Sequence, residues 1–360
     1  MMPTREELRP AGRGAIHFAA CLRQEGAPRA PARGRSWLLK QTAMGLSMAA
    51  SLILPISAHG STSQPYPDRA INLIVPIGAG GVADTSARIL AQRLGEHLKV
   101  PVVVQNKPGG GQSIGADYVM RSRPDGYTLM FSTGGFVAAP FLMKGFKLDP
   151  VHDFKPVSLV ASSNNVLVGS NTIPGGTLKD LVDLAKARPG EVFYGSPSGA
   201  TTLIFEHLNQ VTGMKLEPIL YQSTPAAWAD IIGGRIHATM EGPALALGQV
   251  QAGNARVLAV FGPGRTPEFP DVPTVAEQGY PGFGIESWQG LWAPKDTPAD
   301  IVNVLEQAVI AVMTTPQMKQ EMRAAGLDAK GSTASEFAKE IQDNTDLWRQ
   351  VTTAAGIQPQ

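Results

Sequence analysis

From Tyr66 onward, short apolar runs alternate with amphipathic stretches. The runs 71–76 and 100–105 predict buried strands, and 84–99 between them carries apolar residues at helical spacing. The same order continues along the chain. Further strands are predicted at 127–132, 165–170, 191–195, 219–221 and 255–261, and helices at 114–121, 178–186, 201–212, 226–232, 298–312, 315–325 and 335–353. This repetition predicts an α/β fold with parallel strands and crossover helices.

Residues 1–60 have a different pattern. A basic segment at 33–40 precedes an apolar, small-residue run at 44–56, and Ala58–Gly60 provides a small-x-small exit. These features predict a secretory signal cleaved near Gly60, preceded by a long N-terminal extension. The alternative is a membrane anchor, but the run is shorter than the roughly 20 apolar residues needed and contains Pro55. The long basic region leaves open a start codon downstream of Met1.

Composition narrows the function. A chain of 360 residues exceeds what one hydrophobic core usually supports, so two lobes are expected. Lys and Arg total 31 against 30 acidic residues, a balance that does not indicate a nucleic-acid partner. Cys21 is the only cysteine. If the signal is cleaved near Gly60, the mature protein has no thiol for disulfides, metal binding or nucleophilic catalysis.

The segment Val75–Asp84 carries the most chemical information. A strand runs into a glycine-rich loop that opens a helix, and the free N–H groups at such a junction favour an anion. Asp84 in the first turn could cap the helix or bond a ligand. The alternative is a plain structural turn between strand and helix.

Tyr194–Thr202 repeats this arrangement with small hydroxyl residues. Its hydroxyls could bind an anion, although capping by Ser198 or Thr201 explains them equally well. In doubly wound folds ligands bind beyond the carboxyl ends of strands, so the two loops could face one crevice.

Enzyme signatures are weak. Residues 78–83 fit the dinucleotide pattern G-x-G-x-x-A, but 104–106 lack the expected acidic ribose ligand. Residues 195–199 resemble a nucleophile elbow, yet Pro197 stands where the serine belongs. The histidines lack metal-ligand spacing. We therefore predict no catalytic residue, no metal and no cofactor, and interpret Trp288 and Trp292 as packing residues.

With these loops placed, the chain from Tyr66 onward resembles the Bug family of periplasmic receptors, the substrate-binding subunits of tripartite tricarboxylate transporters. The resemblance covers essentially the whole mature chain. The matching stretches, in family order, are 66–69, 75–84, 102–111, 124–129, 153–158, 194–197, 230–234, 271–277 and 292–294.

The resemblance implies a two-domain type II periplasmic-binding-protein fold, each domain a mainly parallel sheet flanked by helices, with the ligand cleft between them. Residues 66–166 and 286–360 would form domain 1, and 167–285 domain 2. It implies a monomeric periplasmic receptor, not an enzyme, that captures a small carboxylate (a di- or tricarboxylate, acidic amino acid or related organic acid) for integral-membrane permease subunits.

By position, the resemblance also implies a set of ligand-binding residues in two facing loops and at the floor between them. They are Ile77, Gly78, Ala79, Gly80, Gly81, Val82, Ala83, Asp84, Ser132, Thr133, Ser196, Ser198, Gly199, Ala200, Thr201, Tyr221 and Glu241.

Several of these positions depart from the family pattern. Ile77 replaces a frequent Phe, and no His stands near Leu203 or Ile204. The segment 221–224, His237 and Glu241 also differ, so the ligand's identity does not transfer. Two other functions stay open: an exported sensor that signals to a membrane histidine kinase, and an exported α/β hydrolase or dinucleotide oxidoreductase.

Overall fold

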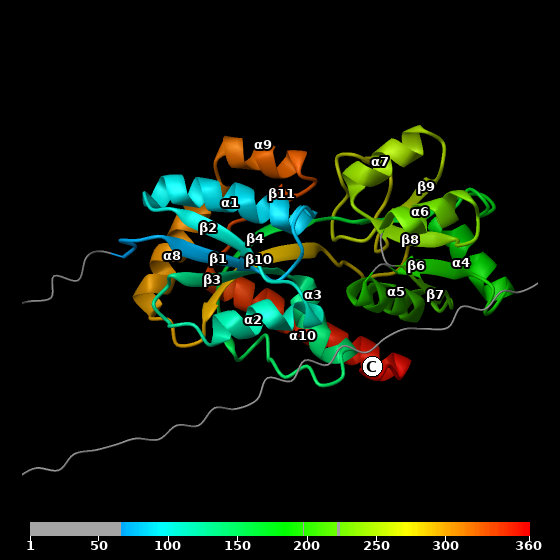
Figure 1. Cartoon of the computed structure of the whole chain (residues 1–360). Helices are drawn as coiled ribbons and strands as arrows, with labels where there is room; N and C mark the ends of the chain where they lie inside the picture. Colours follow the sequence, from blue (N-terminus) through cyan, green and yellow to red (C-terminus); the bar gives the residue numbers. More distant parts are fainter. Residues whose placement is uncertain (1–65, 197, 222–223) are drawn as a thin grey trace, which may run out of the picture. The chain divides into compact units, whose positions relative to one another are not determined.

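The computed structural model describes residues 66–196, 198–221 and 224–360. The predicted export signal, its cleavage site and Cys21 lie outside the described residues. The described chain forms two β-sheets flanked by helices (Figure 1). The runs predicted as strands and helices from Tyr66 onward are present, with ends that shift by a few residues.

The first sheet has six strands in the order β11-β4-β10-β3-β1-β2. Its strands are β1 (Ile71–Val75), β2 (Val102–Asn106), β3 (Thr128–Thr133), β4 (Phe154–Ser163), β10 (Ser287–Pro294) and β11 (Asp328–Ala329). The helices that pack with it are α1 (Val82–Leu98), α2 (Ser113–Met120), α3 (Gly134–Leu142), α8 (Ala299–Met313), α9 (Pro316–Ala324) and α10 (Ala334–Ala355), and a short 3-10 turn, η1 (Gly110–Gln112), precedes α2.

The second sheet has five strands in the order β7-β6-β8-β5-β9. Its strands are β5 (Val166–Gly169), β6 (Phe193–Ser196), β7 (Glu217–Leu220), β8 (Ala238–Glu241) and β9 (Arg256–Val260). The accompanying helices are α4 (Leu178–Ala187), α5 (Gly199–Thr212), α6 (Thr224–Ile232) and α7 (Pro243–Gln251).

Both sheets are mixed, and in each most strands point the same way, as predicted: β1–β4 in the first sheet and β6–β9 in the second. Strands β1, β2 and β3 run parallel, but β10 pairs antiparallel with both β3 and β4. In the second sheet β5 pairs antiparallel with β8 and β9. The reason is the path of the chain: it leaves the first sheet through β4, enters the second through β5, and returns from β9 to β10. The outgoing strands β4 and β5 therefore pair antiparallel with the returning strands β10 and β9.

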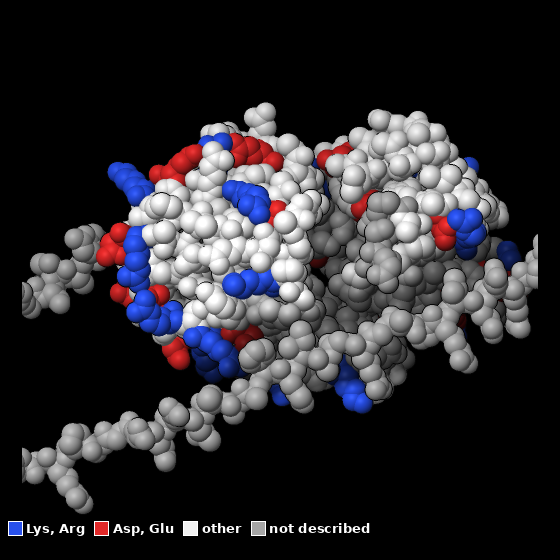
Figure 2. All heavy atoms as spheres, viewed as in Figure 1, with Lys and Arg blue, Asp and Glu red and all other residues white. Residues whose placement is uncertain are grey.

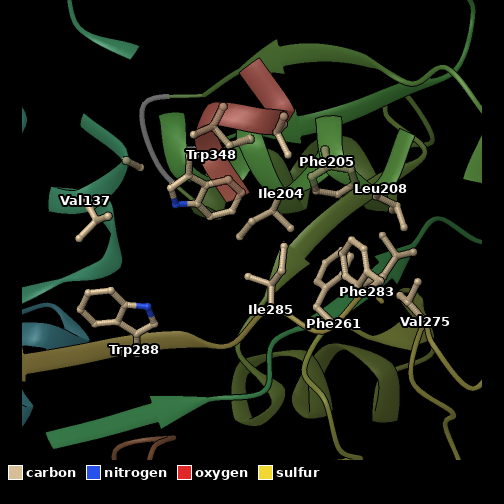
Figure 3. Close-up of a cluster of buried hydrophobic side chains, with 14 of the residues drawn as sticks. Val137, Ile204, Phe205, Leu208, Phe261, Val275, Phe283, Ile285, Trp288 and Trp348 are labelled. Atoms are coloured by element: carbon tan, nitrogen blue, oxygen red, sulfur yellow. The ribbon is translucent and has the colours of Figure 1, made fainter. Parts of the chain in front are cut away.

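Two apolar clusters hold the first sheet. One lies between its strands and the helices α1 and α8, with Leu73, Leu90 and Leu305 fully buried. The other begins on α3 and α10 and continues without a break into α5 and the second sheet. Ile204, Ile285, Trp288 and Trp348 from four separate segments approach one another within it (Figure 3). This shared cluster joins the two sheets through α3, α5 and α10.

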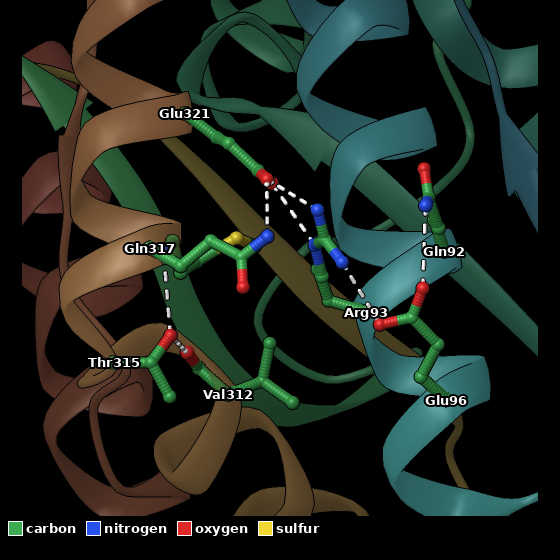
Figure 4. Close-up of polar contacts among 8 residues, drawn as sticks. Gln92, Arg93, Glu96, Val312, Thr315, Gln317 and Glu321 are labelled. Carbon is green, nitrogen blue, oxygen red and sulfur yellow. Dashed lines mark hydrogen bonds and ion pairs between the residues drawn. The ribbon is translucent and has the colours of Figure 1, made fainter.

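Helix α9 is tied to α1 by charged side chains. Arg93 Nε donates to Glu321 Oε2 at 3.1 Å, and a second guanidinium nitrogen of Arg93 pairs with the other oxygen. Gln317 on the same helix donates to Glu321 Oε1 at 3.1 Å (Figure 4). This bidentate pair, partly buried, holds α9 against α1.

None of the helices among the described residues is both long enough and apolar enough to cross a bilayer. Within the same residues, no group of three or more His, Cys, Asp or Glu side chains gathers in a way that could hold a metal ion.

Candidate functional site

Residues from both sheets line one cavity of about 850 Å³. The side facing the first sheet is formed by Gly80–Ala83, Gly111, Gln112, Thr133–Gly135 and Gln289, and the opposite side by Ser198–Thr201, Met240–Gly242, Ala244 and Leu245. In the space-filling view most atoms beside the hollow are white, that is, neither acidic nor basic (Figure 2). The volume lies in the range of small-molecule sites in proteins.

Helices α1, α3, α5 and α7 all begin at this cavity, because residues of their first turns are among those that line it. The first N–H groups of a helix have no partner within the helix, and the helix dipole places partial positive charge there. Helix starts from both sheets therefore place partial positive charge around the cavity. Such an arrangement stabilises a bound anion without a basic side chain.

The start of α1 is open. Its N-cap is Gly81, which has no side chain to accept from the first turn, and the first backbone bond of the helix is Thr85 N–H to Gly81 O at 2.9 Å. The N–H groups of Val82 and Ala83 therefore remain available, and both residues line the cavity. Gly80 has a φ of +88°, a conformation that side chains rarely adopt, so glycine is required for this turn.

Asp84 does not line the cavity. It is 4% exposed, and its Oδ2 accepts from Gly80 N–H at 2.9 Å and from Arg88 Nε at 3.0 Å. Its Oδ1 accepts from Asn106 Nδ2 at 2.8 Å. The bond from Arg88, with those from Gly80 and Asn106, lowers the pKa of Asp84 to about 2. The carboxylate thus holds the glycine-rich loop in place behind the cavity wall.

The start of α5 is closed by its own hydroxyls. Ser198 Oγ accepts from Thr201 N–H at 3.3 Å and lies 3.0 Å from Thr201 Oγ1. Ser196 is buried off the cavity and bonds Ser198 O and Thr202 Oγ1, each at 2.8 Å. Ser198, Gly199, Ala200 and Thr201 line the cavity. Capping, one of the two roles proposed for these hydroxyls, is the role that this geometry shows.

The floor is built around Gln112. Its Oε1 accepts from the buried Ser132 hydroxyl, and its Nε2 donates to Thr133 Oγ1 at 3.2 Å. Thr133 caps α3 by accepting from Gly135 N–H at 3.3 Å and lines the cavity, whereas Ser132 lies behind it. Gln112 has a φ of 79° and also lines the cavity.

Tyr221 is not a cavity-lining residue. Its hydroxyl donates to Asp230 Oδ2 at 2.6 Å, and Asp230 also binds Arg235, whose Nε lies 2.7 Å away. Burial raises the pKa of Tyr221 to about 12. His237 also lies off the cavity, where its Nδ1 accepts from Phe193 N–H at 3.1 Å. Ile77, Gly78 and Ala79 precede the part of the α1 loop that reaches the cavity.

Glu241 lies at the cavity, at the end of β8. It is 8% exposed, and its oxygens accept from Trp228 Nε1 at 2.9 Å and from Gly242 N–H at 2.8 Å. Burial raises the pKa of this carboxyl.

Several cavity-lining residues were not predicted from the sequence. They are mainly on β10, on α10, near the β4–β5 crossing and at the end of α9: Ser163, Asn165, Ile285, Glu286, Ser287, Trp288, Gln289, Ala324–Leu327, Asn344 and Trp348. Trp288 Nε1 donates to Asn344 Oδ1 at 3.1 Å, and Gln289 accepts from the buried Ser86 hydroxyl. No short motif marks these residues. The one available signal was the pair of tryptophans at 288 and 292, of which Trp288 is at the cavity.

Residues 86–357 match the family described as the tripartite tricarboxylate transporter family receptor. The protein BugT of Bordetella pertussis is 33% identical over 314 residues, which span 85% of this chain and 94% of BugT. Two solved structures are also similar. One is the periplasmic binding protein BugD (30% identity, TM-score 0.68, 82% of this chain and 100% of that one). The other is an R. palustris protein with adipate (31% identity, TM-score 0.70, with the same coverage).

The likeness to these periplasmic binding proteins confirms the predicted fold class. The relatives are solute-binding receptors rather than enzymes. With its matched residues, its full-length relatives and its cavity between two sheets, this chain belongs to the tripartite tricarboxylate transporter receptor family, which includes the Bug proteins.

Proposed function

We propose that this protein is a periplasmic receptor that captures a small organic acid and delivers it to the integral-membrane permease subunits of a tripartite tricarboxylate-type transporter. The observation that carries the proposal is the convergence of helix starts on one cavity, with the start of α1 left uncapped. The R. palustris relative with adipate supports an acid as ligand. The receptor is not an enzyme, acts as a monomer and does not bind nucleic acid.

The proposed lobes are residues 66–166 with 286–360, and 167–285. The division is supported by the path of the chain, which crosses between sheets after β4 and again before β10. Ligand contacts to both sides of the cavity would favour a closed arrangement of the two lobes, as differential binding requires.

The proposed binding residues fall into two groups. Gly80–Ala83, Thr133, Ser198–Thr201 and Glu241 line the cavity and would contact the ligand or its water shell. Ile77, Gly78, Ala79, Asp84, Ser132, Ser196 and Tyr221 do not line the cavity and would act by holding the loops that do. In this view the ligand's carboxylate binds the N–H groups of Val82 and Ala83, and Asp84 positions them.

Calorimetric titration of the purified protein with a panel of mono-, di- and tricarboxylates and amino acids, adipate included, tests this function. We expect at least one acid to bind with a dissociation constant between about 1 μM and 1 mM, that is, with a binding free energy of about −8 to −4 kcal/mol. Mass spectrometry of the protein as purified would identify a retained acid. If no acid of the panel binds and none is retained, the proposed function is wrong.

The cellular location of the protein can be tested separately. We propose export to the periplasm with cleavage near Gly60, supported by the basic and apolar segments of residues 1–60 and by the periplasmic relatives. Cell fractionation and N-terminal sequencing of the mature protein should give a periplasmic chain that begins close to Ser61. A chain that retains residues 1–60 in the membrane fraction would contradict this.

A further inference from the structure

The walls of the cavity carry negative charge and no balancing positive charge. Among the described residues that line it, Glu241 and Glu286 are the charged side chains, and no Lys, Arg or His is present. Glu286 is paired with Lys330, whose Nζ lies 3.4 Å from its Oε1. Glu241 has no such partner in the described part of the chain, since its bonds come from a neutral indole and a neutral amide.

A buried carboxylate with only neutral partners is costly, because burial removes its hydration. Glu241 is 8% exposed and accepts one bond at each oxygen. A carboxylate offers about four acceptor positions, so acceptor capacity remains on this lining residue. A ligand that brings a cationic donor to this wall would supply the missing countercharge.

The starts of α7 and α1 differ in the N–H groups that they leave free, so the two ends of the cavity favour different charges. At α7 the Glu241 carboxylate already accepts from Gly242 N–H, and Pro243 at the first helical position has no N–H to offer. At α1 the N–H groups of Val82 and Ala83 lack a capping side chain. An anion is therefore favoured near α1, and a second anion near Glu241 would meet like charge.

We propose that the ligand is a zwitterion, with one carboxylate at the start of α1 and an ammonium group at Glu241, and that the cavity discriminates against di- and tricarboxylates. This inference rests on the proposed receptor function and narrows its substrate class. It also separates this chain from the R. palustris relative with adipate, whose ligand carries two carboxylates.

The test uses probes that differ in one group. Adipate, hexanoate and 6-aminohexanoate share a six-carbon chain and end in a carboxylate, a methyl group or an ammonium group; leucine and 4-methylpentanoate form a second, branched pair. Calorimetry should show the amino-bearing member of at least one series binding about 30-fold or more tighter than its partners, the loss typical of leaving a buried charge unpaired.

Substitutions at Glu241 test whether this residue causes the preference for the amino-bearing probe. Glu241→Gln removes the charge and should abolish the preference for the amino-bearing probe, whereas Glu241→Asp keeps the charge and should retain part of it. Glu206→Gln is the matched control: Glu206 on α5 is also a partly buried glutamate whose pKa is raised by burial, but it does not line the cavity, and the preference should persist. Thermal melting of each variant without ligand confirms folding.

The outcomes separate the two proposals. If adipate or citrate binds the natural protein more tightly than any amino-bearing probe, the receptor function stands and the zwitterion inference is wrong. If Glu241→Gln folds and keeps the preference, Glu241 is not the acceptor and the inference is wrong. If no probe in either series and no acid of the wider panel binds, the proposed function itself fails, and the inference fails with it.

Discussion

The starts of α1 and α5 are both strand-to-helix loops at the cavity, yet they use their polar groups in opposite ways. At α1 a glycine occupies the N-cap, and the first residues of the helix line the cavity without a side-chain cap. At α5 the N-cap Ser198 accepts from Thr201 N–H, and Ser196 bonds within the loop. In the proposed function the α1 start donates to the ligand, whereas the hydroxyls at the α5 start stabilise their own loop and helix. Similar sequence patterns can therefore serve binding in one place and folding in another.

The largest effect should come from Asp84→Ala, which removes the carboxylate that holds the α1 loop. The N–H of Gly80 and the amide of Asn106 lose their acceptor. We expect the free energy of unfolding in urea to fall by about 3 kcal/mol, with weaker acid binding as a second consequence. Arg88→Ala is the control, since Arg88 is half exposed and its loss should cost less than about 1 kcal/mol. Equal losses in both variants would contradict a locking role for Asp84.

Val82→Pro should separate binding from stability at the same loop. Val82 is the first helical residue, where proline is well tolerated, and Gly81 before it is already extended. The change removes one N–H at the cavity. We expect affinity for the tightest acid of the panel to fall about 30-fold, or about 2 kcal/mol, the value of a charge-assisted hydrogen bond.

The control for this substitution is Val82→Ala, which shortens the exposed side chain and keeps the N–H. Calorimetry should show it near the natural affinity, and thermal melting should show both variants folded. If proline and alanine at position 82 weaken binding equally, the N–H is not a ligand donor. The chain itself places proline at the same position in α7 and α9, so this substitution has a natural precedent in the fold.

Acid should weaken the α1 loop through the same carboxylate. The pKa of Asp84 is lowered from 3.8 to about 2 in the folded protein, so its ionised form stabilises the fold above pH 4. That contribution, up to about 2 kcal/mol, should be lost as pH falls through 4 toward 2. In urea titrations between pH 6 and 3, the stability gap between the natural protein and Asp84→Ala should therefore narrow as the pH falls. A stability gap that stays constant with pH would contradict the assignment.

The sequence predicted the α1 loop better than the rest of the site, for physical reasons. Glycines before a helix limit the local backbone to few conformations, so Gly80–Ala83 could be placed at a helix start from the sequence alone. Whether Asp84 faces the ligand or the loop depends on Asn106, which is 22 residues away in the chain. The prediction for Tyr221 depended in the same way on Asp230, which takes its hydroxyl bond.

Strand β10 and helix α3 were not predicted from the sequence, because their local patterns are weak signals. Strand β10 mixes tryptophan, glutamine and glycine and is buried along nearly its whole length, so it shows no alternation. Helix α3 begins with two glycines and contains Pro140, both poor helix signals. The contribution of β10 to the cavity, such as Gln289, follows from the return path of the chain between the sheets, which local sequence pattern does not encode.

The smallest effect should come from Ser198→Ala at the start of α5. The hydroxyl accepts from Thr201 N–H, so its loss should lower the free energy of unfolding by about 1 kcal/mol. Ser198→Gly should recover most of this, because glycine is a tolerated N-cap that costs only a few tenths. The affinity of Ser198→Ala for the tightest-binding acid of the panel should fall by less than about fivefold, well below the loss for Val82→Pro. If Ser198→Ala instead weakens binding as strongly as Val82→Pro, the Ser198 hydroxyl contacts the ligand. The contrast between the uncapped start of α1 and the self-capped start of α5 then does not hold.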